Sequence, residues 1–306
     1  MASQKHWFVI INPTSGNGLA GRKWIKIKSL LDAHGFRYSS AFTSRPNHSA
    51  ELIQNSVNQG FINFICVGGD GTIHNMVNGI MTQKLVPSST INLGVIPIGT
   101  GNDWVKTHAI PKNLKKAIKL IESGTLKCQD VGKIEFINKE TSPIYFNNLA
   151  GIGFDGYVAS KVQKYKSLGA ISYLTGALVG LFGFKNFKAT VAYNNDEVKT
   201  NTLMVLVGLC QYSGGGMQLT KNPDPFDGLF DISIPANFGK FDIIKNIVKL
   251  FNGKITNSEK VITSKTNAIS IMVDKKNPPF VQADGELIGK GDFKASVIPK
   301  ALSFYA

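Results

Sequence analysis

Cysteine is scarce in this chain of 306 residues. The three cysteines, Cys66, Cys128 and Cys210, lie in apolar or strand-like stretches, and no two of them form a C-x-x-C pair. Neither a disulfide framework nor a zinc site is indicated. A reducing compartment, the cytoplasm, fits this composition best.

Long apolar runs are also lacking. Residues 1–7 pass from polar residues into a short apolar strand, without the apolar stretch and small-residue cleavage site of a signal peptide. The most apolar later stretch, residues 169–184, contains four glycines and is too short to cross a bilayer core of roughly 30 Å as a helix. We therefore expect a cytoplasmic protein that associates peripherally, if at all, with the inner face of a membrane.

Acidic residues are outnumbered, 20 Asp and Glu against 34 Lys and Arg, so the formal net charge is +14. Such a surface attracts anionic partners: nucleotides, nucleic acid or acidic lipid headgroups. The basic residues are spread along the chain instead of forming a tail, which disfavours a nucleic-acid-binding arm. A merely solvated basic surface is the alternative.

The first third of the chain alternates short β-rich runs with amphipathic segments. This alternation is typical of an α/β domain in which helices cover a parallel sheet. We expect strands at 6–12, 37–43, 61–67 and 91–96, and helices from Trp24 to before Gly35 and at 49–59, 73–81 and 114–122. Ligands of such sheets bind at the carboxyl ends of the strands.

Strands dominate after residue 124, and turn signals such as Asn194-Asn195 separate them, which indicates an antiparallel β-sandwich. Expected strands are 131–137, 144–150, 188–193, 203–209, 229–234, 268–273, 280–283 and 295–298, with helical inserts at 155–184 and 238–251. We predict an α/β domain at 1–127 and a β-sandwich domain at 128–295, with 296–306 able to pack back on the first domain.

The strongest local motif is the glycine-rich loop Gly68-Gly69-Asp70-Gly71-Thr72, between an apolar strand and a helix. Glycines let the backbone approach a polyphosphate, the helix N-terminus offers N–H groups to anionic oxygen, and Asp70 can hold a metal ion. A merely structural turn is the alternative, but an aspartate between glycines is a poor choice for one.

Two further strands end in similar loops, at 97–103 (PIGTGND) and 12–18 (NPTSGNG). Gly16, Gly18 and Gly21 match G-x-G-x-x-G, but no acidic residue follows the second strand to hold a ribose, so the dinucleotide interpretation is weak. The Walker-type P-loop is absent from the sequence.

These loops, in their order and spacing, resemble the diacylglycerol kinase catalytic-domain family, which includes bacterial diacylglycerol kinases and the sphingosine and ceramide kinases. The resemblance covers nearly the whole chain. It extends through Asn148-x-x-Gly151-x-Gly153-x-Asp155, Asp224-x-x-Asp227-Gly228-x-x-Asp231 and Asp284-Gly285-Glu286.

The resemblance implies an ATP-dependent lipid kinase with Mg²⁺ as cofactor. Its catalytic residues would be Glu286 as general base, Asp284 in support of the base or the metal, and Asp70 for magnesium and phosphate. Asn102 and Asp103 would place the lipid headgroup, and Asp224, Asp227 and the Leu229 carbonyl would form a structural magnesium site. The implied ATP-binding residues are Asn12, Ser15, Gly16, Thr43, Gly68, Gly69, Gly71, Thr72, Gly99, Thr100 and Gly101.

Two of these assignments have a structural alternative. Residues 283–286 could be a simple hairpin loop, and Asp224 and Asp227 could serve turns around Pro223 and Pro225. Asn17 and Asn75 stand where the family often has a cation and a glutamate, so Arg22, Lys23 or Lys161 is left to supply the phosphate-binding charge.

The acceptor that the resemblance favours is diacylglycerol, giving phosphatidic acid, at an anionic membrane surface; a sphingoid base or another lipid alcohol is the alternative. A kinase of a soluble nucleotide like NAD kinase, and a catalytically silent nucleotide- or lipid-binding regulator, are competing functions. Nucleic acid is not an expected partner. The apolar stretch 169–184 lines an acyl-chain pocket or caps the core, and the sandwich edges could pair in a homodimer.

Overall fold

The computed structural model describes residues 5–137, 139–162, 180 and 183–306. The chain divides into two compact units: unit 1 comprises Met1–Gln129 and Lys300–Ala306, and unit 2 comprises Asp130–Pro299. The sequence-based prediction places the divisions after residues 127 and 295. Two strands contain both divisions, β5 (Leu126–Phe136) and β16 (Phe293–Tyr305), so the chain passes between the units in extended conformation.

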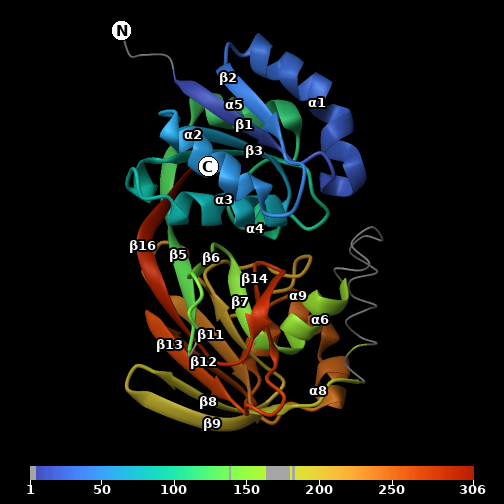
Figure 1. Cartoon of the computed structure of the whole chain (residues 1–306). Coiled ribbons are helices and arrows are strands. Elements are labelled where there is room, and N and C mark those ends of the chain that lie inside the picture. Colours follow the sequence, from blue (N-terminus) through green and yellow to red (C-terminus); the bar gives the residue numbers. More distant parts are fainter. Residues whose placement is uncertain (1–4, 138, 163–179, 181–182) are drawn as a thin grey trace. The chain divides into compact units, whose positions relative to one another are not determined.

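Unit 1 is built on a parallel sheet (Figure 1). Strand β2 (Arg37–Phe42) pairs with β1 (His6–Ile11), β1 with β3 (Asn63–Gly68), and β3 with β4 (Asn92–Pro97), all in parallel. The end of β16 continues the sheet, since Ser303 and Phe304 lie opposite Asn92 and Leu93 of β4. The carboxyl ends of β1, β3 and β4 therefore lie at one edge.

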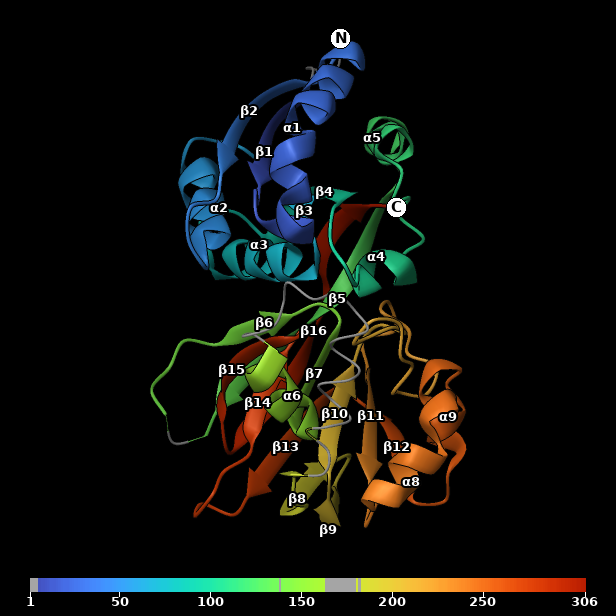
Figure 2. The ribbon, with the colours of Figure 1, turned by 90° about the vertical axis from the view of Figure 1, so that its right-hand side faces the viewer.

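Helices cover both faces of this sheet (Figure 2). Helices α1 (Ser15–Ala33) and α5 (Leu114–Ser123) pack on one face, and α2 (His48–Asn58) and α3 (Asp70–Thr82) on the other. Two shorter elements, η1 (Ser88–Thr90) and α4 (Asp103–Thr107), flank β4 in the sequence. Helices α2 and α3 pack closely, since a Cβ on Gly79 would lie 2.8 Å from the Ala50 Cα.

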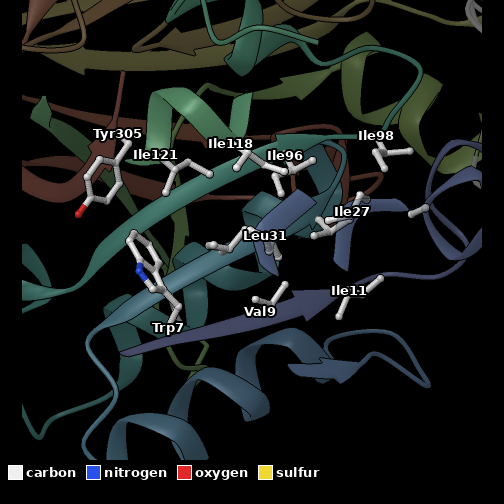
Figure 3. Packing of buried hydrophobic residues seen from close by; sticks show 13 residues of the cluster. Trp7, Val9, Ile11, Ile27, Leu31, Ile96, Ile98, Ile118, Ile121 and Tyr305 are labelled. Atoms are coloured by element: carbon white, nitrogen blue, oxygen red, sulfur yellow. The ribbon is translucent and has the colours of Figure 1, made fainter. Parts of the chain in front are cut away.

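The core between the sheet and helices α1 and α5 follows directly from the sequence periodicities (Figure 3). Trp7, Val9 and Ile11 alternate along β1 and point to this face, as a strand requires. The helices contribute side chains at helical spacing: Ile27 and Leu31 from α1, and Ile118 and Ile121 from α5. Tyr305 of β16 closes the cluster against Trp7, with ring centroids 5.5 Å apart.

Unit 2 is a β-sandwich of antiparallel strands. In one sheet β16 pairs with β13 (Ala268–Val273), followed by β8 (Phe187–Tyr193) and β9 (Asp196–Thr202). Strand β5 also pairs with β16, and β6 (Ile144–Phe146) pairs with β5. The other sheet has the order β12 (Val261–Thr266), β11 (Phe230–Pro235), β10 (Met204–Gly208), β7 (Leu149–Gly153), β14 (Phe280–Ala283), β15 (Glu286–Lys290). The helical elements among its described residues include α6 (Phe154–Val162), α8 (Lys240–Lys245), α9 (Ile247–Phe251) and η3 (Lys254–Asn257).

The fold class predicted from the sequence, α/β followed by an antiparallel sandwich, is confirmed, but several elements differ. Three unpredicted strands, β9, β12 and β15, are all edge strands of their sheets. Edge strands bury little and carry polar residues, so they lack an apolar pattern. The expected strand 144–150 breaks at Asn147 and Asn148 into β6 and β7, and the expected helix 238–251 is two short helices.

Candidate functional site

The three glycine-bearing loops predicted to bind phosphate converge in unit 1, where they follow β1, β3 and β4. The tightest approach joins the second and third loops. A Cβ on Gly99 would lie 2.7 Å from the Gly69 Cα, and one on Gly69 would lie 3.0 Å from the Gly99 Cα. A side chain at Gly99 would collide with the Gly69 backbone and with Asn102 Oδ1, and one at Gly69 would press on the Gly99 backbone. These glycines are therefore needed for the loops to touch, whatever they bind.

The first loop is tied to the start of helix α3 by side chains. Asn12 Nδ2 donates a hydrogen bond to Thr72 Oγ1 at 3.0 Å, and the Ser15 hydroxyl lies 3.3 Å from the same oxygen. Residues 16–18 then adopt left-handed conformations, with φ values of 60°, 56° and 80°. A Cβ on Gly16 would lie 3.2 Å from Ile98 Cγ2, so this loop also reaches the third loop.

Asp70 is the charged group at the junction. Its carboxylate accepts hydrogen bonds from the amides of Asp103 and Trp104, each at 3.3 Å. Burial, and to a smaller extent the nearby Asp103 carboxylate, raise the pKa of Asp70 to about 6, although hydrogen bonds from backbone amides oppose the shift. Two acidic groups side by side at a helix start favour a cation between them and an incoming phosphate.

The remaining predicted ligands differ in exposure. Asn102 is 3% exposed, adopts φ 53°, and braces the third loop by donating from Nδ2 to the Gly99 carbonyl at 2.9 Å. Its Oδ1 is buried and has no hydrogen-bond partner in the described residues. Thr100 is exposed, and the Thr43 amide donates to the Ile11 carbonyl at 2.8 Å, which places Thr43 beside the end of β1. The roles assigned to these residues stay predictions.

In unit 2, residues 283–286 form a tight β-hairpin between β14 and β15. Ala283 pairs with Glu286, and the two turn residues, Asp284 and Gly285, have φ values of 52° and 82°. Positive φ at both central positions defines a type I′ turn, for which Asp-Gly is a preferred sequence. The simple hairpin considered as an alternative is thus the geometry that holds the half-buried Glu286 at the first position of β15.

The Asp284 carboxylate is occupied by the backbone. It accepts hydrogen bonds from the amides of Asn147, Asn148 and Leu149 at 3.1, 2.9 and 3.2 Å, and its own amide donates to the Leu149 carbonyl. Asp284 therefore holds the hairpin turn against the β6–β7 connection. The sequence contains no signal of this contact, because its partners lie more than a hundred residues away.

The residues predicted to hold structural magnesium form a turn before β11. Asp224 Oδ1 and Asp227 Oδ1 accept from the amides of Phe226 and Leu229, both at 3.0 Å. Lys265, which sequence reasoning did not consider, donates to Asp227 Oδ2 at 2.7 Å and to Asp231 Oδ2 at 2.8 Å. Among the described residues no group of three or more His, Cys, Asp or Glu side chains is arranged to enclose an ion.

Most of the apolar stretch 169–184 lies outside the described residues. Lys161, at the end of α6, is exposed and lies 5.4 Å from the centroid of the Tyr157 ring. Within the described part of the chain, no helix is both long and apolar enough to span a bilayer.

Comparison with known proteins agrees with this architecture. Residues 6–134 match the family described as the diacylglycerol kinase catalytic domain, and residues 148–306 match the YegS C-terminal NAD kinase β-sandwich-like domain. The chain therefore belongs to the diacylglycerol kinase catalytic-domain family.

Relatives of similar length are known from several bacteria. A Bacillus subtilis protein named "Putative lipid kinase YtlR" is 28% identical over 97% of this chain and 98% of its own. A diacylglycerol kinase of the same organism is 26% identical over 92% of this chain and 89% of its own. The fold is that of a diacylglycerol kinase structure from Bacillus anthracis str. Sterne, with a TM-score of 0.74, 24% identity, and coverage of 100% of this chain and 98% of that one.

Replacing Asp70 by asparagine should stabilise the ligand-free protein at high pH. The pKa of Asp70 is higher in the folded than in the unfolded state, so ionisation costs stability as the pH rises through about 4 to 6, and the cost is complete above that range. We expect Asp70→Asn to raise the free energy of unfolding by about 3 kcal/mol at pH 8 and not at pH 4. Denaturant unfolding at both pH values measures this, and an equal effect at both would contradict it.

Replacing Asp284 by alanine should destabilise unit 2, because three amides lose a charged acceptor. We expect a loss of about 1.5–3 kcal/mol in the free energy of unfolding, the usual range for hydrogen bonds to a charged group. The control is Asp274→Ala, which removes an exposed carboxylate bound to one local amide, that of Lys276. Equal losses for the two variants in urea unfolding would refute the bracing role.

Proposed function

We propose that this protein transfers the γ-phosphate of ATP to the hydroxyl group of a membrane lipid. The observation that carries the proposal is the meeting of the 12–18, 68–72 and 97–103 loops at the start of α3. Backbone amides, a helix N-terminus and an acidic residue lie together there, and groups of these kinds bind phosphates and metal ions in phosphoryl-transfer enzymes. Family membership and the names of the relatives support the same reaction.

In the proposed reaction the lipid hydroxyl oxygen attacks the γ-phosphorus, its proton passes to the Glu286 carboxylate, and the bond to the β-phosphate oxygen breaks to release ADP. A carboxylate base at an alcohol is typically worth roughly 10²–10⁴-fold in rate. The type I′ hairpin supports this role, because it fixes the residue that follows it. Asp284 acts here through the backbone it holds.

A magnesium ion bound with ATP would supply charge neutralisation to the phosphates. Asp70 offers the oxygen ligand that Mg²⁺ prefers, and Mg²⁺ usually binds through one or two carboxylates while keeping several waters. The Asp224–Leu229 turn offers oxygen donors of the same kind for a second, structural ion. There the Lys265 ammonium already neutralises part of the acidic charge.

We assign Arg22 as the cation that binds the phosphates. The family often has a cation where this chain has Asn17, and Arg22 would take over its role. Its Nη1 donates to the Asn17 carbonyl at 3.1 Å, so the guanidinium lies along the first phosphate loop. A Cβ on Gly18 would lie 3.0 Å from the same nitrogen. An arginine laid against the loop backbone can bind phosphate in two-pronged fashion.

Diacylglycerol is the proposed acceptor, and an anionic inner membrane surface is the proposed location of the reaction. The net charge of +14 supports attraction to such a surface. A sphingoid base or another lipid alcohol is the alternative acceptor. The test is phosphate transfer from radiolabelled ATP with Mg²⁺ to diacylglycerol, a sphingoid base or ceramide in mixed micelles, with soluble NAD as a separate arm.

Transfer to a lipid with none to NAD is the expected result. Transfer to NAD alone would reject lipid as the acceptor, and no transfer to any acceptor, with ATP still bound, would favour a silent regulator.

Replacing Glu286 by glutamine should lower kcat by about 10²-fold or more, because the amide cannot accept the hydroxyl proton. ATP affinity, measured by calorimetry without lipid, should stay within about twofold of the original because the phosphate loops are intact. Unchanged turnover would remove Glu286 from the role of base.

A further inference from the structure

A buried glutamine links the Glu286 hairpin to an acidic residue far away in the sequence. Gln282 of β14 is 4% exposed. Its Nε2 donates to Asp155 Oδ2 at 2.9 Å, and its Oε1 accepts from the Gly285 amide at 2.8 Å. One end of the side chain can only donate and the other only accept, so the two contacts fix its orientation.

Glycines in β7 and α6 make room for this contact. Gly151 lies directly opposite Gln282 in the β7–β14 pairing, and a Cβ at position 151 would collide with Asp155 Oδ2. Gly156, the next residue after Asp155, would collide through its Cβ with the Phe280 backbone of β14. The first turn of α6 therefore rests on β14, and the Asp155 carboxylate rests on Gly151. This accounts for the spacing of Gly151 and Asp155.

The Asp155 carboxylate lies in an environment that is unfavourable for a charged group. Its Oδ1 is buried without a hydrogen-bond partner in the described residues. Burial raises the pKa of Asp155 to about 6, opposed by the Gln282 side chain and by amides at the start of α6. A buried carboxylate destabilises a fold unless its partners compensate, so its presence calls for a purpose.

We propose that Asp155 is a positioning residue that acts through Gln282 to fix the Asp284-Gly285 turn and thereby the direction of Glu286. The turn is then held from two sides, at Gly285 by Gln282 and at Asp284 by the amides of residues 147–149. This inference rests on the proposed role of Glu286 as base. A base displaced by about 1 Å can lose about 10²-fold in rate, so such bracing matters for catalysis.

The test compares kcat and the lipid KM of the full-length protein and its variants with the acceptor that the lipid screen identifies. Gln282→Met removes both hydrogen bonds at nearly constant volume, and Asp155→Val removes the acceptor. Each should lower kcat about 10–100-fold with little change in KM. Asp155→Asn keeps an oxygen that can accept from Gln282 and should stay within about threefold of the original kcat.

Thr202→Val is the matched control, since it also removes a buried side-chain group, one that donates to the Met204 and Pro235 carbonyls of the same unit. It should leave kcat unchanged at comparable loss of stability. If Asp155→Val does not fold, comparison of Gln282→Met with Asp155→Asn still tests the positioning role.

An unchanged kcat in Gln282→Met would overturn the inference. So would an Asp155→Asn variant that is as impaired as Asp155→Val and has a raised lipid KM, because that result would make Asp155 a substrate ligand. Glu286→Gln in the same assay separates the two proposals. If it is active, the base assignment fails; if it is inactive while Gln282→Met is fully active, only the positioning role fails.

Discussion

The backbone contact between Gly69 and Gly99 is the constraint on which the unit 1 site depends. Strands β3 and β4 run parallel and in register up to the Gly68–Pro97 pair, so the loops that follow leave the sheet together. They meet so closely that a Cβ on Gly99 would collide with the Gly69 backbone, and one on Gly69 would lie only 3.0 Å from the Gly99 Cα. Because the third loop lies against the second, the amides of Asp103 and Trp104 reach the Asp70 carboxylate. A larger residue at 69 or 99 would push the second and third loops apart.

The hairpin in unit 2 solves a related problem with different means. A two-residue turn is short and, at the end of an edge strand, has few neighbours to hold it. Here each turn residue has a hydrogen-bonding partner from elsewhere in the unit: Asp284 takes three amides of the β6–β7 connection, and the Gly285 amide donates to Gln282. Side-chain hydrogen bonds thus hold the hairpin in place, whereas in unit 1 the contact between the backbones of two loops does so.

Local patterns predicted much of this from sequence, and long-range pairing accounts for what they missed. The strand–glycine loop–helix units and the Asp-Gly turn carry their signals within a few residues, so the loops and the hairpin could be anticipated. The contacts of Asp284 with residues 147–149, of Gln282 with Asp155 and of Lys265 with Asp227 join segments 38 to 137 residues apart. No periodicity reports such pairs. The edge strands β9, β12 and β15 were not predicted, because polar residues in them obscure the alternation of apolar and polar residues that marks a strand.

Three aspartates of this chain show why residue type alone does not assign a role. The Asp284 carboxylate accepts hydrogen bonds from backbone amides, which stabilises the hairpin. Burial raises the pKa of both Asp70 and Asp155 to about 6, so each is less favourable in the folded protein than a neutral residue would be. A carboxylate that lowers stability persists where its charge serves something else. For Asp70 the service that we propose is binding of a cation and a phosphate at the converging loops. For Asp155 we propose that it is the orientation of Gln282, and through it of the hairpin that bears Glu286.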